Sequence, residues 1–144
     1  MRLPGSILQG ILARAALVLL RIYLGVIFLL AAWTRLTGES TPRFTGFLEQ
    51  VALDRGPQVA ALITWGELLV GLTLVLGLMT RLSATLALLL LAHYLLAKGA
   101  WFCQCPSNDG ALAAIAVALL LGAAGRTFGL DALLAKRWPR SPFW

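Results

Sequence analysis

Charged side chains are scarce in this sequence. Only 12% of its 144 residues are Asp, Glu, Lys or Arg, whereas an average soluble domain has about 25%. Hydrophobic residues make up 60%, against about 45–50% in an average soluble domain. A water-soluble fold of this size could not bury so much apolar surface. The composition therefore excludes a soluble protein and predicts an integral membrane protein with one domain over residues 1–144.

Residue types that hold cofactors are also few. The chain has two cysteines and one histidine. It contains no Gly-rich nucleotide loop, no Cys-x-x-Cys-His haem site and no paired histidines for haem. A structural zinc ion needs four N or S ligands, which the two thiols do not supply. No cofactor is evident, and we expect no metal site.

The positive net charge does not indicate a nucleic-acid partner. The balance is +6 at pH 7, but the basic residues stand singly at the ends of apolar runs and form no stripe. Such placement is typical of membrane insertion. The expected partners are the lipid bilayer and other membrane or periplasmic proteins, and no nucleic acid.

Four apolar segments have about the length that a membrane-spanning helix needs, roughly 17–25 residues. They are predicted over about 15–33, 58–78, 82–97 and 111–125. Gly and Ala are frequent in the second and fourth segments and let helix backbones approach closely. The sequence therefore predicts an all-α fold, an integral membrane four-helix bundle.

The connection between the first two segments is long, from Thr34 to Pro57. Within it, apolar residues recur at the i, i+3, i+4 and i+7 spacing of a helix, namely Phe44, Phe47, Leu48 and Val51. This spacing favours a short interfacial helix on the membrane surface between helices 1 and 2. An ordinary loop whose apolar residues cover the end of the bundle is the alternative.

The distribution of Lys and Arg predicts the orientation. One side carries Arg2, Arg14, Arg81, Arg126, Lys136, Arg137 and Arg140, and the other carries Arg35, Arg43, Arg55 and Lys98. The excess on the first side places both termini in the cytoplasm, with the protein in the inner membrane. The connection that holds both cysteines then faces outward, into a compartment that permits disulfides.

Three ionisable residues fall inside the apolar segments. Glu67 and His93 each lie about 16 Å from the cytoplasmic side, and Arg21 lies about 9 Å from it, at 1.5 Å per residue. One interpretation is a buried polar cluster that fixes helix packing. The other is a site for a quinone head group or a proton path. Arg35 and Arg81, at helix ends, are expected to anchor the chain at the interface.

Cys103 and Cys105 lie in the polar stretch "WFCQCPSNDG" (101–110). A disulfide between residues i and i+2 needs a bent backbone, because the two Cα atoms must be about 4.4–6.8 Å apart. Such a ring would be strained, and strained exposed disulfides exchange readily with other thiols. A redox-active pair, two inert buried cysteines and, least favoured, half a metal site are the alternatives.

Three stretches of the chain resemble the DoxX family. "RIYLGVIFLLAAWTRL" (21–36) resembles its first helix, and "WGELLVGLTLVLGLMTRLSATLALLL" (65–90) its second, with Glu67 and Arg81 at matching places. "SNDGALAAIAVALLLGAAGRTFGLDALL" (107–134) resembles its last helix and closing stretch. Asn108 and Asp131 match there, and we expect structural roles for both.

This resemblance implies a four-helix membrane bundle in a redox setting. Members of the family include a subunit of thiosulfate:quinone oxidoreductase and partners of superoxide dismutase and a thiosulfate sulfurtransferase. The MauE-like branch, tied to disulfide formation in a periplasmic partner, carries a similar Cys–x–Cys before the last helix. That branch continues with Phe–Gly, whereas Pro106 and Ser107 follow here.

Two functions follow as hypotheses. The first is a membrane subunit of a redox complex that passes electrons between thiols or thiosulfate-derived sulfur and quinone, or that supports periplasmic disulfide chemistry. Cys103 and Cys105 are its candidate catalytic residues. The second is a non-catalytic accessory subunit that stabilises a larger membrane complex. The sequence leaves open which of the two applies, and thus whether the chain is an enzyme.

Overall fold

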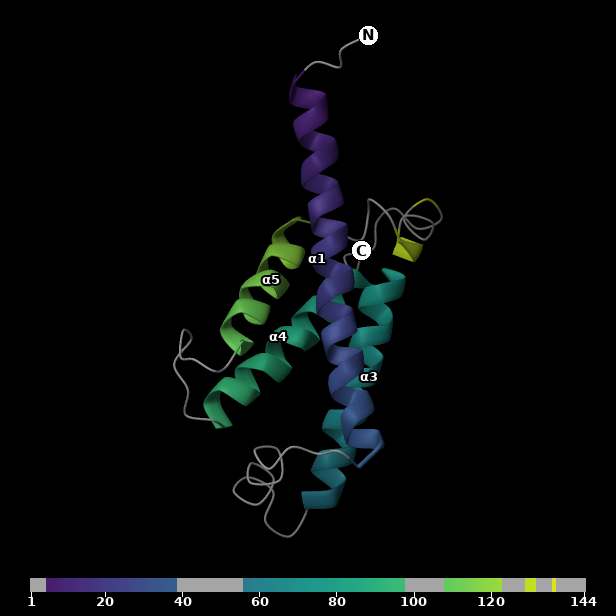
Figure 1. Cartoon of the computed structure of the whole chain (residues 1–144), viewed down its shortest axis with the longest axis vertical. Helices are drawn as coiled ribbons and strands as arrows, with labels where there is room; N and C mark the ends of the chain where they lie inside the picture. Colours follow the sequence, from purple (N-terminus) through teal and green to yellow (C-terminus); the bar gives the residue numbers. More distant parts are fainter. Residues whose placement is uncertain (1–4, 39–55, 98–107, 123–128, 132–135, 137–144) are drawn as a thin grey trace.

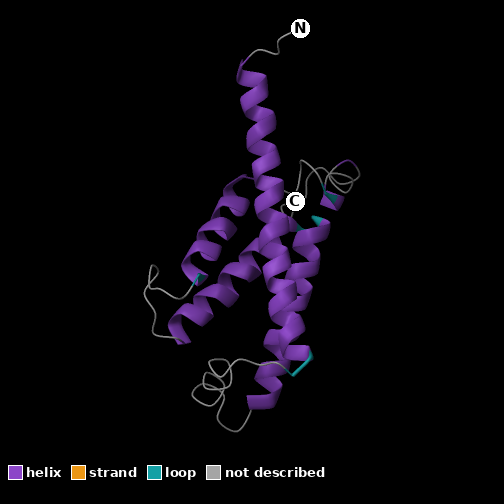
Figure 2. Ribbon diagram, viewed as in Figure 1, coloured by secondary structure: helices purple, strands orange, loops and turns teal. Residues whose placement is uncertain are grey.

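In the part of the chain that the structure, a computed structural model, describes, every regular element is a helix. This part covers residues 5–38, 56–97, 108–122, 129–131 and 136, and it contains no strand (Figure 2). The elements are α1 (Gly5–Leu36), α3 (Gly56–Leu76), α4 (Thr80–Ala97) and α5 (Asp109–Gly122) (Figure 1). The predicted all-α class is confirmed, and each predicted apolar segment overlaps one of these helices.

Two of the helices are long and apolar enough to cross a membrane, over Leu8–Leu36 and Gln58–Leu76. The core helix of a soluble protein would be mostly buried, but only 28% and 33% of their most apolar windows are buried here. The apolar stretches in α4 and α5, Thr80–Leu95 and Asp109–Gly122, are shorter. The outward-facing leucines of these helices need lipid, not water, as their solvent.

The helices enclose one apolar core. α1 packs against α3 and α5, and α4 packs against the same two helices (Figure 1). The buried core residues are Leu24, Phe28, Val70, Leu74, Ala84, Ala87, Leu91, Ala113, Ala116 and Leu119. Small residues dominate the contributions of α4 and α5, which lets these two backbones approach each other closely.

The antiparallel helices α1 and α3 cross at two glycines. A β-carbon built on Gly71 would lie 2.9 Å from the carbonyl oxygen of Gly25 and 2.9 Å from the backbone nitrogen of Leu29. Gly71 is therefore level with the turn of α1 between these two residues. Counting outward from this crossing at equal rise, Trp65 is level with Trp33.

The helix ends follow local rules. The last turn of α1 carries Arg35, which the helix dipole favours, and Gly38 follows with φ +80° as a left-handed C-terminal cap. At the start of α5, the carbonyl of Asn108 accepts a hydrogen bond from the Leu112 amide at 3.0 Å. Asp109 lies in the first turn, where the dipole favours an acidic side chain.

The turn from α3 to α4 is tight, and two of its residues have positive φ. Gly77 has φ +66° and Met79 has φ +48°. These left-handed residues end α3 at Leu76, two residues before the predicted end at 78. We call the side of the molecule that holds this turn the Arg21 end, and the opposite side, where α1 finishes, the Arg35 end.

Two predictions fall on residues outside the described part. The interfacial helix would occupy the first connection, of which residues 39–55 are not described. The connection that carries Cys103 and Cys105, residues 98–107, is likewise outside it. Both stay predictions.

Candidate functional site

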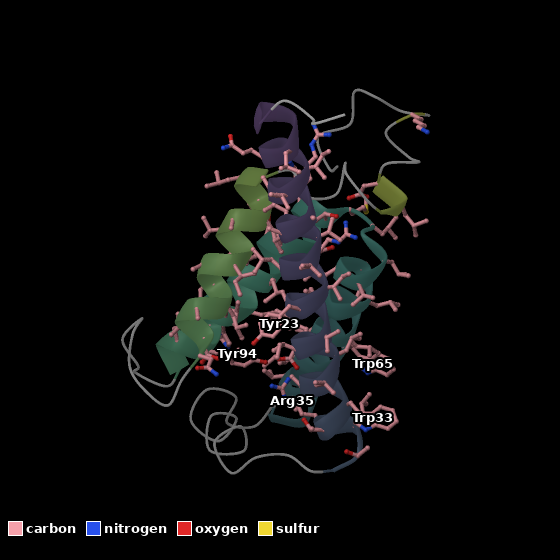
Figure 3. The ribbon with its side chains drawn as sticks, turned by 45° about the horizontal axis from the view of Figure 1, so that its top comes forward. Tyr23, Trp33, Arg35, Trp65 and Tyr94 are labelled. Carbon is pink, nitrogen blue, oxygen red and sulfur yellow. The ribbon has the colours of Figure 1, made fainter. Side chains whose placement is uncertain are left out.

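Glu67, in the middle of α3, is the centre of a buried polar cluster. Its side chain is 1% exposed. The Arg35 guanidinium, from the last turn of α1, donates to Oε2, and the Tyr94 hydroxyl, from α4, donates to Oε1 at 2.5 Å. The guanidinium carbon of Arg35 lies 5.6 Å from the centre of the Tyr94 ring, within cation–π range. Figure 3 shows Arg35 and Tyr94 converging from different helices.

This arrangement joins three helices through one carboxylate. A buried carboxylate is costly unless it is paired and hydrogen-bonded. Here each oxygen of Glu67 has a donor from a different helix. The cluster of Arg35, Glu67 and Tyr94, which we call the Glu67 cluster, therefore fixes how α1 and α4 sit on α3.

A second polar cluster lies at the Arg21 end. The Arg21 side chain is 3% exposed and lies directly against two glycines. A β-carbon on Gly77 would meet its guanidinium at 2.6 Å, and one on Gly129 would meet it at 2.9 Å. Asp131, which is fully buried, is close enough to attract the guanidinium electrostatically.

Asp131 also clamps the turn between α3 and α4. Its carboxylate accepts hydrogen bonds from the backbone amides of Met79 at 2.5 Å and Thr80 at 2.8 Å. Its own amide donates to the carbonyl of Gly77 at 2.9 Å. The carboxylate thus caps the N-terminus of α4 from a distant segment, where the helix dipole favours negative charge. We call this contact the Asp131 clamp.

The two clusters are well separated. Arg21 and Arg35 are 14 positions apart in α1, which corresponds to about 21 Å at 1.5 Å per residue. The single cluster expected from Glu67, His93 and Arg21 is therefore not formed. Arg21 is level with Gly77, which lies in the α3–α4 turn ten positions after Glu67.

The contribution of α4 to the Glu67 cluster comes from Tyr94, while the side chain of His93 is exposed. The sequence did not single out Tyr94, because the high cost of insertion into lipid marks ionisable residues such as Glu67, His93 and Arg21 rather than a neutral phenol. The position of Tyr94 in the sequence was the available signal. Tyr94 is adjacent to His93, which was predicted at the same depth as Glu67.

The predicted interfacial residues occupy different settings. Arg35 is half-buried and paired with Glu67, so it does more than anchor a helix end. Arg81 is half-buried in the first turn of α4, and Asn108 is exposed where α5 begins. Asp131 is buried in the clamp. In the described residues, no three His, Cys, Asp or Glu side chains are grouped to hold a metal ion.

Two helices that are long and apolar enough to cross a membrane, with most of their apolar windows exposed, indicate a helical membrane protein. The DoxX family model matches residues 16–99, more than half of the chain. The chain belongs to the DoxX family. No curated protein matches the sequence, and no solved structure does.

Proposed function

We propose that this DoxX-family chain is an accessory membrane subunit, a four-helix bundle that stabilises a larger membrane complex. The bonding of Glu67 supports this proposal most directly. A carboxylate that relays protons or contacts a substrate is expected to be reachable by the group on which it acts, but the Glu67 side chain is only 1% exposed. Both oxygens of Glu67 instead accept hydrogen bonds from neighbouring helices, as expected of a residue that fixes helix packing.

The Asp131 clamp supports the same role. Its two oxygens are engaged by backbone amides of the α3–α4 turn, and the segment that carries it lies against Arg21 at Gly129. The buried acids of the described part thus serve to build a rigid unit. A rigid unit with a lipid-facing apolar surface can present a fixed face to another membrane protein.

Co-purification tests the proposal. An affinity-tagged chain is extracted from membranes in mild detergent, and the proteins that accompany it are identified by mass spectrometry. The expected result is a fixed set of partner subunits and no quinone reductase activity for the chain alone. Glu67→Gln is expected to lower partner recovery severalfold, whereas Arg14→Gln, at an exposed position, leaves recovery unchanged. A chain that purifies alone and still reduces quinone would overturn the accessory role.

Thiol chemistry at Cys103 and Cys105 is the second candidate function. The observation that favours it is the Cys–Gln–Cys sequence in the connection between α4 and α5. Two thiols that form a strained disulfide can exchange with a partner and pass electrons onward, with quinone as one acceptor. This function requires the connection to face an oxidising compartment.

Alkylation of the thiols tests the second function. Intact cells are treated with a membrane-impermeant maleimide with and without prior reduction, and the number of labelled thiols is read by mass spectrometry. A redox-active pair takes up label only after reduction. Equal labelling of both thiols in the two samples would exclude cycling. The Cys103→Ser/Cys105→Ser variant provides the zero-label control.

For the orientation, we propose an inner-membrane protein with both termini in the cytoplasm and the cysteine connection outside. The excess of Lys and Arg at the chain ends and at the α3–α4 turn supports it. Fusions of alkaline phosphatase and green fluorescent protein to the C-terminus discriminate the two orientations. Phosphatase activity at the C-terminus would contradict the proposal.

A further inference from the structure

α1 is much longer than the helices on which it packs. It has 32 residues, about 48 Å at 1.5 Å per residue, against a hydrocarbon core of about 30 Å. Its N-terminal part extends beyond the other helices at the Arg21 end (Figure 1). Water, another protein or lipid can surround this extension.

The exposed apolar residues of α1 form one continuous stripe along the whole helix. Its members are Leu8, Ile11, Leu12, Leu19, Ile22, Tyr23, Val26, Leu30, Trp33 and Leu36. They recur at the three- and four-residue spacing that keeps side chains on one side of a helix. At the level where α3 ends and α4 begins, the stripe continues from Ile22 to Leu19, so the solvent that covers it on one side of this level is expected to cover it on the other.

Two tryptophans mark one boundary of that solvent. Trp33 and Trp65 are 64% and 61% exposed, and they are level with each other across the Gly25–Gly71 crossing. Figure 3 shows both on the same outer side of α1 and α3. Exposed tryptophans at one level on neighbouring helices are typical of the membrane–water interface.

The opposite membrane boundary is located by its distance from Trp33 along α1. Arg14, which is exposed, is 19 positions before Trp33, about 28 Å along the helix and close to the thickness of the hydrocarbon core. Gly77, in the α3–α4 turn, is only 12 positions beyond Trp65, about 18 Å. The turn is therefore about 10 Å short of the level of Arg14.

From these distances, we infer that the α1 stripe down to Arg14 is a contact surface for acyl chains, and that the α3–α4 turn is sunk about 10 Å into the leaflet at the Arg21 end. Irregular backbone at such a depth must have internal hydrogen-bond partners. The Asp131 clamp supplies them for Gly77, Met79 and Thr80. The attraction between the buried Arg21 and Asp131 side chains meets the same requirement for charge.

Spin labels at two lipid-facing positions test the inference. Leu19 and Leu82 are exposed leucines on α1 and α4 close to the level of the turn, and each is replaced by cysteine in the Cys103→Ser/Cys105→Ser background. Val26, exposed nearer the middle of α1, provides a control that lies in hydrocarbon wherever the boundary falls. The labelled chain is reconstituted in vesicles of phosphatidylcholine and phosphatidylglycerol, and collisions with oxygen and with a polar nickel chelate are measured.

The expected result is that both labels behave like the label at Val26. They collide with oxygen, and their nickel accessibility is on the order of tenfold lower than that of a label at Leu8, because the polar chelate is excluded from hydrocarbon. High nickel accessibility at Leu19 and Leu82 would place the turn at the surface and overturn the inference. Exclusion of both reagents at Leu19 would also overturn it, because a protein would then cover the stripe.

A label-free measurement makes the test independent of the cysteine variants. Tryptophan fluorescence is quenched with lipids brominated near the headgroup or near the chain ends, in the wild-type chain and in Trp33→Phe/Trp65→Phe. The difference between the two proteins isolates these residues. Stronger quenching by the shallow bromines supports the inference. Stronger quenching by the deep bromines would place Trp33 and Trp65 near the membrane centre and overturn it.

Discussion

Gly25 and Gly71 face each other so closely that neither position has room for a side chain. A β-carbon on Gly25 would lie 3.0 Å from the carbonyl oxygen of Gly71, and one on Gly71 would lie 2.9 Å from that of Gly25. Both obstacles are backbone atoms, which cannot rotate away as a side chain can. The two glycines therefore set the spacing and the register of α1 against α3.

Replacing Gly71 with alanine is expected to destabilise the protein. The added methyl group forces the backbones apart, and overpacking of this kind costs about 1–3 kcal/mol. Gly66 provides a matched control on the same helix, because a β-carbon there meets nothing within 4 Å. Gly66→Ala should be neutral or gain up to about 1 kcal/mol from helix propensity.

The measurement is the free energy of unfolding by SDS titration in mixed micelles. Both substitutions change helix propensity equally. A difference in unfolding free energy between the two variants therefore reports on the crossing of α1 and α3. Equal stabilities of Gly71→Ala and Gly66→Ala would show that α1 and α3 can separate at no cost.

The ion pair between Arg35 and Glu67 is expected to stabilise the fold through the interaction of its two charges. Glu67→Gln leaves the Arg35 guanidinium half-buried without its counter-charge, and breaking a buried pair costs about 3–5 kcal/mol. Arg35→Gln should cost a similar amount. The double variant removes both charges, so it is expected to lose clearly less stability than the two single losses added together.

A double-mutant cycle of unfolding free energies measures this coupling. Arg14→Gln, at an exposed position, is the charge-matched control and should change stability by less than about 0.5 kcal/mol. Strict additivity of Glu67→Gln and Arg35→Gln would mean that the two side chains do not stabilise each other.

The sequence was sufficient for the helices but not for their register. Long apolar runs locate membrane helices because every backbone polar group in lipid must be bonded within the segment. Hydropathy does not tell how far one helix is shifted along the next. Arg35 ends α1, and its position suggested only an anchor at the interface. Because α3 starts well beyond that level, Arg35 also meets the middle of α3.

The same lack of register explains the missed clamp. Asp131 and Met79 are 52 positions apart, and no sequence motif indicates that they are in contact. Similarity to the DoxX family marked Asp131 as a matching position without indicating its contact. Only the turn formed by Gly77 and Met79 exposes the amides that the carboxylate binds.

Loss of the Asp131 clamp should be visible at the backbone. In Asp131→Asn, one carboxylate oxygen is replaced by an NH₂ group that cannot accept a hydrogen bond, so the Met79 or Thr80 amide loses its acceptor. Faster hydrogen exchange is expected at these two amides, together with a loss of about 1–3 kcal/mol for the unsatisfied group. Lys136→Gln, at an exposed position, is the control. Unchanged exchange at Met79 and Thr80 would contradict the clamp.

Gly77 allows backbone strain to be separated from contact with Arg21. Both Gly77 and Gly38 have positive φ, +66° and +80°, but a β-carbon on Gly38 meets nothing within 4 Å, whereas one on Gly77 meets the Arg21 guanidinium. Gly38→Ala is therefore expected to cost only the left-handed strain, about 1–2 kcal/mol. Gly77→Ala should cost this amount and, in addition, the displacement of a buried charge from beside Asp131.

Unfolding free energies of the two variants, measured under the same conditions, give the difference directly. A greater loss for Gly77→Ala that disappears when Arg21 is also replaced by alanine would assign the excess to the guanidinium contact, because the space that Arg21 vacates accepts the methyl group. Equal losses for Gly38→Ala and Gly77→Ala would show that Arg21 can move aside freely. The attraction to Asp131 would then not fix the position of the Arg21 side chain at this end of the molecule.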